Sequence, residues 1–444
     1  MILTQEEEAM LRGDEGEAAK LAMEILTKVG EKFGAERLVP VASAHIVLAM
    51  YKSIFDAGVE VCEKFAAMGA KFRVPTTLDP SGMDTQLWRE FKTPDAYAEK
   101  QLRVAKAYEQ MGAIMSWTCL PHFTGSAPRF GEHVGWTESS AVAFINSVLG
   151  ARSNRETAVV DVCIGITGRT PEYGLHLQQN RYGKALVKLE IGGRTLQSWE
   201  YPVLGYFLGK TLGSEIGVVE GLAGSPKTDE LKSMLAAAAA SGPLAMVHLV
   251  GITPEARTRA EAFGPNHAER TVTVTEETLK TTRDEMCTVK SGKIDLVALG
   301  CPHYSIAEIQ NVVKLLAGRK IAPSTELWIY TTKQVRDLAD RMGIMAELLA
   351  LGGKIATETC MLISPVETWG FKTLMTDSGK CSYYAPVQCK TDVIFGSAAE
   401  CVEAAVNGQV LTPQQAKSGL PGEPVLTPQQ AKSGLSGDPV GGKA

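Results

Sequence analysis

The sequence predicts an α/β fold with several lobes and mostly parallel sheets. Short apolar runs alternate with amphipathic helical segments along most of the chain, and strands that alternate with helices favour parallel sheets. The 444 residues suffice for two or three lobes at roughly 150 residues each. Apolar residues make up 45% and charged residues 21% of the chain, which is ordinary for a globular protein with a large core.

The first half of the chain opens with a capping box, Thr4-Gln-Glu-Glu7, which predicts the start of a helical stretch that extends to about Gly34. Short apolar runs predict strands at 38–42 and 72–74. The spacing of apolar residues predicts helices at 58–68 and 95–111.

The second half continues this alternation. Strands are expected at 244–250, 294–299 and 326–330. Helices are expected at 275–286, 305–317 and 333–351, the last with a break at Gly343. These elements belong to a folded region that we place at residues 1–408. The glycine-rich stretch 221–226 is a candidate boundary between lobes.

The last segment, residues 409–444, has a different composition. Residues 410–424 and 425–439 form a tandem repeat of fifteen residues rich in proline, glycine, serine and glutamine. A segment without aromatic residues cannot bury enough surface to fold alone, so we predict a disordered tail. A duplicated docking motif for an unknown protein is the alternative, because two copies of one motif raise avidity.

Charge and targeting signals exclude several classes of protein. The formal net charge of −5 gives no basic excess for binding nucleic acid. The acidic N-terminus does not resemble a secretory signal, and the most apolar stretch, 235–250, is too short and interrupted to span a membrane. We therefore expect a cytoplasmic protein. Its nine cysteines, an odd number with wide spacings, favour reduced thiols or a metal site over disulfides.

Three of the cysteines share a context that points to metal ligands. Cys119, Cys301 and Cys360 each follow an apolar run that is expected to be a strand, with a proline after the thiol. Ligands gather at the carboxyl ends of strands in open α/β sheets, so three thiols can converge there. Thiolates favour zinc, copper(I) or an iron–sulfur cluster, and the chain lacks the C-x-x-C pairs of a structural zinc site. A small buried cysteine is the alternative at each position. We interpret the other six as structural: Cys62, Cys163, Cys287, Cys381, Cys389 and Cys401.

Polar segments flanked by apolar ones are typical of site loops. Arginine suits carboxylates, the Thr76/Thr77 pair can hydrogen-bond an anion, and the turn-like run 376–380 carries a lysine that can be catalytic or bind an anion. A core histidine at 45, a helix cap at Ser139 and structural ion pairs at the arginines are the alternatives. The candidate substrate-binding residues are Ser43, Thr76, Thr77, Glu132, His133, Ser139, Ser140, Arg152, Asn154 and Arg155, and the candidate catalytic residues are His45, Ser378 and Lys380.

Many of these segments, taken in order, resemble the aconitase X family. The resemblance covers nearly all of residues 1 to about 408. It rests on blocks that include Ser43-Ala-His45, Val74-Pro-Thr-Thr-Leu-Asp79, Phe130-Gly-Glu-His133, Glu138-Ser-Ser140, Ala151-Arg-Ser-Asn-Arg155, Gly300-Cys-Pro-His303 and Thr359-Cys-Met361.

The resemblance implies an aconitase-like multi-lobed fold and an iron–sulfur cluster held by three cysteines, which map onto Cys119, Cys301 and Cys360. It also implies a small swivelling domain. No folded segment of that size remains in this sequence, so the resemblance implies a separate small subunit, a heterodimer, and a catalytic serine on that partner. Many relatives carry a cysteine where this sequence has Trp117, a departure that puts the pocket beside the cluster in doubt.

The activity that the resemblance implies is a hydro-lyase, or dehydratase, acting on a small 3-hydroxy carboxylic acid. Arg152, Asn154, Arg155 and the Thr76/Thr77 loop would hold the anionic end. The base would be the partner's serine, or His45 or Lys380 of this chain. The favoured reaction converts cis-3-hydroxy-L-proline to pyrroline-2-carboxylate, and dehydration of mevalonate 5-phosphate by a large subunit is the alternative. A non-catalytic scaffold recruited through the repeated tail and a zinc protein remain as other classes.

Overall fold

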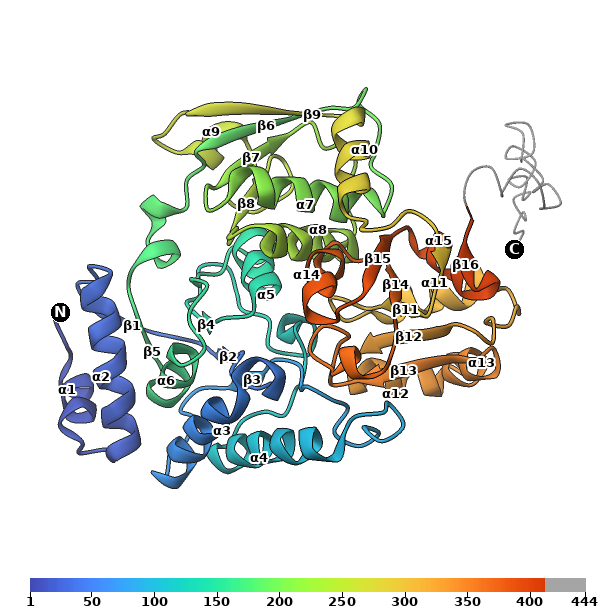
Figure 1. Ribbon diagram of the computed structural model, residues 1–444. Helices are drawn as coiled ribbons and strands as arrows, with labels where there is room; N and C mark the ends of the chain where they lie inside the picture. Colours follow the sequence, from blue (N-terminus) through green and yellow to red (C-terminus); the bar gives the residue numbers. More distant parts are fainter. Residues whose placement is uncertain (412–444) are drawn as a thin grey trace, which may run out of the picture. The chain divides into compact units, whose positions relative to one another are not determined.

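The computed structural model describes residues 1–411, and these contain one compact unit, Met1–Val410 (Figure 1). The repeated segment, predicted to be a disordered tail or a docking motif, lies outside the described residues apart from its first positions. There the prediction needs a correction. Gln409–Val410 form strand β16, which pairs antiparallel with β10 (Gly292–Lys293), so the folded region extends past residue 408. The amide of Ile294 also bonds the carbonyl of Gly408, which anchors this end to the chain.

The N-terminal region contains a three-stranded parallel sheet with the order β3-β2-β4. Strand β1 pairs antiparallel with β5 beside it. The capping box at Thr4 and the helix expected at 95–111 are confirmed. The elements are α1 (Gln5–Arg12), α2 (Glu17–Lys32), β1 (Leu38–Pro40), β2 (Ala44–Ile46), α3 (Tyr51–Ala67), β3 (Thr76–Leu78), α4 (Asp95–Met111), β4 (Gly135–Trp136), α5 (Ser139–Phe144), α6 (Val160–Thr167) and β5 (Arg169–Pro171), with short helical turns at Pro121–Phe123, Ile145–Leu149, Gly174–His176 and Gln178–Asn180.

Two local predictions in this region are wrong. The strand expected at 72–74 is absent, because the amides of Phe72 and Arg73 bond the carbonyls of Met111 and Gly165 instead of a neighbouring strand. Thr76 and Thr77 therefore lie in strand β3, not in a loop. The helix at 139–149 is not capped by Ser139. Its N-cap is Glu138, whose carboxylate accepts the amides of Ser139 and Ser140.

The middle region holds a four-stranded parallel sheet with the order β8-β7-β6-β9. Helices α7 and α8 lie against each other on the side of this sheet that faces α5 and α14 (Figure 1). A Cβ at Gly205 would lie 1.9 Å from the carbonyl oxygen of Met234, so glycine is required for this close approach. The segment 221–226 connects β7 to α8. The elements are β6 (Ala185–Glu190), α7 (Glu200–Leu212), β7 (Gly217–Glu220), α8 (Thr228–Ser241), β8 (Val247–Leu249), α9 (Arg259–Phe263), β9 (Arg270–Thr275) and α10 (Glu276–Glu285).

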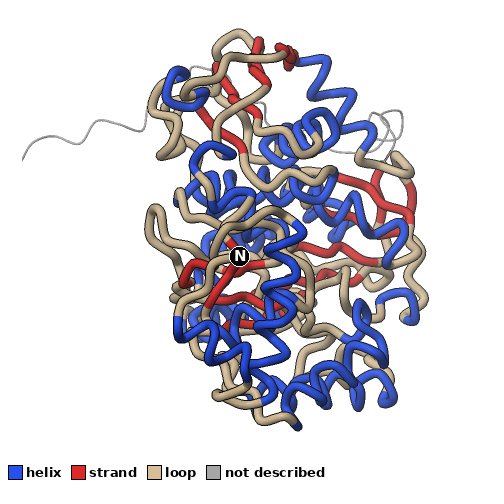
Figure 2. The backbone as a smooth tube through the Cα atoms, turned by 90° about the vertical axis from the view of Figure 1, so that its left-hand side faces the viewer, coloured by secondary structure: helices blue, strands red, loops and turns tan. Residues whose placement is uncertain are grey.

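The C-terminal region is built on a five-stranded parallel sheet with the order β13-β12-β11-β14-β15. The predicted break at Gly343 is confirmed, since that residue separates α12 from α13 with a φ of 76°. Figure 2 shows strands flanked by helices through most of the described chain, as parallel sheets require. The elements are β11 (Leu296–Leu299), α11 (Ile306–Leu316), β12 (Glu326–Thr331), α12 (Lys333–Arg341), α13 (Ile344–Ala350), β13 (Gly353–Thr357), a turn at Val366–Thr368, β14 (Thr373–Thr376), α14 (Gly379–Gln388), β15 (Asp392–Phe395) and α15 (Ala398–Asn407).

A buried ion pair ties the N-terminal region to the middle region. The Arg181 side chain is fully buried and donates to Glu255, to the carbonyl of Leu175, and to both the side chain and the carbonyl of Asn146. No helix in the described part of the chain is long and apolar enough to cross a membrane.

Removing the negative partner of this pair should destabilise the protein. We expect Glu255→Gln to lower stability by about 3–5 kcal/mol, because it leaves the Arg181 charge buried without compensation. The exposed pair between Arg270 and Glu215 provides the control, and Glu215→Gln should cost about 0–1 kcal/mol. Urea denaturation of both variants measures the difference. Equal midpoints for the two variants would contradict this reading of the pair.

Candidate functional site

Two of the three candidate ligand cysteines follow parallel strands of one sheet. Cys301 follows β11 and Cys360 follows β13, so both thiols lie at the carboxyl edge of the five-stranded sheet. The strand-end prediction is confirmed for these two. It is wrong for Cys119, which follows an irregular segment beside β3, where Ile114 bridges Thr77 and the amide of Thr118 bonds the carbonyl of Leu78. All three cysteines are buried.

The three thiols share one charged environment. The Cys301 thiol hydrogen-bonds to Cys360, which lowers the pKa of Cys360 to about 7. Burial raises the pKa of Cys119, while the positive charge of Lys380 and the backbone amide of His303 act in the opposite direction. The Cys119 and Cys301 sulfurs in turn help to raise the pKa of Lys380. One lysine therefore faces sulfurs from two separate regions of the chain.

The donor set suits a multi-iron cluster better than a single metal ion. Within residues 1–411, no three His, Cys, Asp or Glu side chains converge closely enough to hold one ion. A cluster instead distributes its thiolates over several irons. Soft, buried sulfurs beside a lysine, which offsets the negative charge of thiolates, fit such a group.

Lys380 lies in a buried ion pair that joins α14 to α5. Its Nζ donates to the Glu138 carboxylate and lies 3.5 Å from the Ser140 hydroxyl. Burial alone would lower the pKa of Lys380, but Glu138 and the neighbouring sulfurs together raise it well above its usual range. Burial would raise the pKa of Glu138, yet Lys380 and Ser140 hold it at about 2. The pair is therefore fully charged near neutral pH.

His45 and Asp79 form a second polar group in the N-terminal region. His45 Nδ1 lies 2.8 Å from the Thr77 hydroxyl, and that hydroxyl also reaches the carbonyl of Ala44. If Thr77 donates to Ala44, Nδ1 carries the proton and Nε2 is a free acceptor. Nε2 and Asp79 Oδ1 are 3.5 Å apart, and neither has another partner. Burial lowers the pKa of His45 to about 4, so His45 is neutral near pH 7, and burial raises the pKa of Asp79 well above its usual range.

Ser378 and Ser43, two of the predicted site residues, form hydrogen bonds with other groups of the protein. The Ser378 hydroxyl caps α14 by accepting the amide of Cys381 and donates to the carbonyl of Cys301. Ser43 accepts a hydrogen bond from the indole of Trp136 at 3.1 Å. These contacts position the backbone around the thiols and the rings around His45.

Other predicted residues gather in a separate group around the turn at Gly174–His176. His133 Nδ1 lies 2.9 Å from His176 Nδ1, and Arg152 donates to the carbonyl of His176 and to Gln178. Asn154 bonds the backbone of Tyr173 and Leu175. Glu132 accepts the amide of Arg129. The hydrogen bonds of this group hold the turn, so its predicted contact with substrate stays a prediction.

Arg155 and Thr76 form their hydrogen bonds outside the groups described above. The Arg155 guanidinium donates to the carbonyls of Ala239 and Gly242 at the end of α8. The Thr76 hydroxyl bonds the carbonyl of Val74 and faces Gly165 of α6, on the opposite side of β3 from Thr77.

Sequence reasoning missed three side chains of the site. Glu138 and Asp79 belong to the family motifs, but the sequence analysis assigned no role to either. For Glu138, its place just before a helix was a signal for a helix cap. His303 stands two residues after Cys301, yet nothing local in the sequence indicates what its ring contacts.

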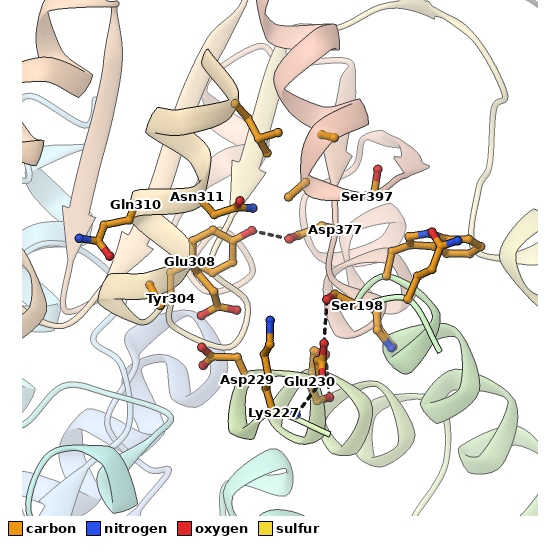
Figure 3. A pocket seen from close by; sticks show the side chains of 18 of the residues that line it. Ser198, Lys227, Asp229, Glu230, Tyr304, Glu308, Gln310, Asn311, Asp377 and Ser397 are labelled. Atoms are coloured by element: carbon orange, nitrogen blue, oxygen red, sulfur yellow. Dashed lines mark hydrogen bonds between the residues drawn. The ribbon is translucent and has the colours of Figure 1, made fainter. Parts of the chain in front are cut away.

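A cavity of about 570 Å³ lies between α8 and α11, and Tyr304 is one of the residues that line it (Figure 3). The Tyr304 hydroxyl points at Asp377 across it. Glu308, which lines the cavity, accepts a hydrogen bond from Lys232. Burial raises the pKa of Asp377 to about 6, although the hydrogen bond from Tyr304 lowers it.

This raised pKa predicts a pH-dependent stability. A carboxyl whose pKa is higher in the folded state favours folding below its unfolded value near 4, and that contribution is lost as the pH rises through about 6. Asp377→Asn keeps the acceptor for Tyr304 and removes the titration. Between about pH 5 and pH 7.5 the wild type should lose about 1 kcal/mol more than this variant in urea denaturation. Asp14→Asn, at an exposed carboxylate, is the control, and parallel pH curves for wild type and Asp377→Asn would refute the assignment.

The fold and the site together define an α/β protein with buried thiols and a buried lysine at the ends of its parallel strands, which is the architecture of an enzyme site. Family models match three successive stretches: the aconitase X first domain at residues 1–179, the second domain at 183–284 and the third domain at 294–407. The chain belongs to the aconitase X family.

The relatives within this family are dehydratases. The chain is 39% identical to the phosphomevalonate dehydratase large subunit of Methanocaldococcus jannaschii, over 91% of this chain and 100% of that protein. It is 40% identical to the cis-3-hydroxy-L-proline dehydratase of Pseudomonas aeruginosa, over 91% of this chain and 70% of that protein. The crystal structure of Thermococcus kodakaraensis aconitase X in its holo-form matches with a TM-score of 0.83 at 37% identity, covering 91% of this chain and 100% of that one. The chain is accordingly a hydro-lyase.

Proposed function

We propose that this chain is the large subunit of an iron–sulfur-dependent hydro-lyase that dehydrates a small 3-hydroxy carboxylic acid, with the cluster held by Cys119, Cys301 and Cys360. The observation that carries the proposal is the buried Lys380, whose positive charge acts on the Cys119 and Cys301 sulfurs, while Cys301 and Cys360 follow strands of one parallel sheet. Three thiolates would leave an iron of such a cluster without a protein ligand, and that iron would supply a Lewis acid for the departing hydroxyl.

The chain's own residues supply charge and orientation. Glu138 holds Lys380 as a cation in a buried place, where its attraction for a carboxylate is strong. The Ser140 hydroxyl donates to the same Glu138 carboxylate and lies 3.5 Å from the ammonium nitrogen, so it holds the ion pair in place. His45 is neutral, with Nε2 free of other partners, so it can accept a proton or a hydrogen bond from the substrate. The surrounding core excludes water from these groups.

For the substrate we favour cis-3-hydroxy-L-proline. Lys380 is a single buried cation near the thiols, and cis-3-hydroxy-L-proline carries a single carboxylate that this cation can bind. The predicted substrate arginines, Arg152 and Arg155, instead donate to backbone carbonyls. Mevalonate 5-phosphate is the second candidate, and coverage favours it, because the chain spans the whole length of the methanogen large subunit.

The share of each relative's length that this chain matches also supports a separate partner subunit. The chain spans 70% of the Pseudomonas enzyme, and the relatives it matches over their full length are named large subunits. We propose that a small subunit completes the site and carries the catalytic serine. The alternative of a non-catalytic scaffold predicts a protein without iron.

The test is co-expression with the candidate small subunit and anaerobic purification. We expect iron and sulfide in the protein, a broad visible absorbance from thiolate-to-iron charge transfer, and dehydration of one of the two acids. Activity on hydroxyproline alone would settle the favoured substrate, and activity on mevalonate 5-phosphate alone would settle the second. An iron-free, colourless protein would overturn the proposal and favour the scaffold.

A further inference from the structure

We infer that His303 is the positioning residue that assembles the three cysteine ligands into one site. The inference rests on the proposed cluster and deepens it, because it names the group that brings Cys119 to Cys301 and Cys360. His303 is fully buried just after β11, two residues beyond Cys301.

His303 contacts the segments that carry the other two ligands. Its ring nitrogen Nδ1 lies 3.1 Å from the hydroxyl of Thr118, the residue before Cys119. Its Nε2 lies 2.9 Å from the carbonyl oxygen of Thr359, the residue before Cys360. One side chain thus bonds the residue before Cys119 and the residue before Cys360, and it stands two residues beyond Cys301.

The hydrogen-bond partners fix the state of the ring. A carbonyl oxygen only accepts, so Nε2 carries the proton and donates to Thr359. Nδ1 is then the acceptor and receives the hydroxyl hydrogen of Thr118. That hydroxyl oxygen also accepts the amide of Leu120, which holds the backbone on both sides of Cys119. A side chain with a donor and an acceptor in a rigid ring is needed to span the two segments.

His303 joins ligand segments that come from different family domains. Cys119 comes from the first family domain, and Cys301 and Cys360 come from the third. Asp84 and Ser81 of the first domain bond Thr357 and Glu358 beside Cys360, and Leu78 in the same stretch accepts the amide of Thr118. His303 adds a direct side-chain link between the residues that precede Cys119 and Cys360. Lys232 of the second domain donates to the carbonyl of His303. His303 is therefore a point where all three domains meet.

Outer hydrogen bonds of this kind orient metal ligands, and losing one typically lowers metal affinity by ~10–100-fold. His303→Ala should therefore bind its cluster less tightly by a factor in that range. Thr118→Val removes only the hydroxyl on the Nδ1 side at nearly constant volume and should show the same direction of change. His303→Gln retains a donor near the Nε2 position and should rescue part of the loss.

The experiment measures iron and sulfide per chain after anaerobic purification with the small subunit, and then the rate at which visible absorbance fades in the presence of EDTA. We expect lower content and faster fading for His303→Ala and Thr118→Val, with Thr118→Ser close to wild type. His248→Gln is the matched control, because His248 is also buried and bonds a carbonyl, that of Arg181, in the second domain.

The outcomes separate this inference from the proposed function. Wild-type iron content and fading rate in both His303→Ala and Thr118→Val would overturn the inference and leave the cluster proposal standing. An iron-free wild type would overturn both. If His303→Ala does not fold, Thr118→Val against Thr118→Ser decides the question, since that pair differs in the hydroxyl that bonds the ring.

Discussion

Cys301→Ser is expected to remove most of the iron and nearly all of the dehydration activity, and Cys119→Ser and Cys360→Ser should do the same. A Lewis-acidic metal contributes several kcal/mol to the transition state, which corresponds to on the order of 10³-fold in rate. Iron content, visible absorbance and kcat/KM on the active substrate measure the effect together.

The matched control for these variants is Cys62→Ser. Cys62 is equally buried, but its thiol lies near the hydroxyl of Tyr108 and the carbonyl of Leu48, which can accommodate a serine hydroxyl. It should retain wild-type iron and activity. Full iron content in any one of the three ligand variants would remove that cysteine from the ligand set.

Lys380→Met should lower kcat/KM by ~10²–10⁴-fold, the range expected when a positioned catalytic or charge-stabilising group is lost. Iron content should stay close to that of the wild type, which separates loss of the ammonium group from loss of the cluster. Lys380→Arg keeps the charge and should recover part of the activity. Lys210→Met, at an exposed ion pair with Glu285, is the control and should leave kcat/KM unchanged.

The partner of Lys380 offers an independent check. Glu138→Gln keeps an acceptor for the amide of Ser140 but leaves the buried lysine without its counter-charge. Such a loss costs about 3–5 kcal/mol of stability. We expect a lower denaturation midpoint together with lower kcat. A variant with wild-type stability and kcat would show that the ion pair neither holds the fold nor positions the lysine.

Features that depend on neighbouring residues were predictable from the sequence. The helix at 95–111 matches α4 because apolar residues at helical spacing and the following Gly112 determine its span. The break at Gly343 follows from a backbone angle that glycine tolerates. Cys301 and Cys360 were placed correctly because each follows a strand of the same parallel sheet. The three cysteines were grouped by their shared sequence context, and the family motifs point to the same three.

Predictions that depended on distant contacts succeeded less well. Cys119 follows no strand, and the amides near 72–74 bond residues far along the chain. Arg152 and Arg155, chosen because guanidinium groups suit anions, donate to backbone carbonyls in this fold. Residue type told us what these side chains can bind, but not which partner lies within reach.

The sequence by itself therefore determined the α/β class, most helices and strands, and the identity of the candidate ligands, because periodicity, caps and strand ends act over a few residues. Only the tertiary structure decided that Glu138 neutralises Lys380 and that His303 bridges Thr118 and Thr359, residues 242, 185 and 56 positions apart in these pairs. The reason is physical. Burial makes an unpaired polar group costly, and for these buried side chains the partner is supplied by packing rather than by proximity along the chain.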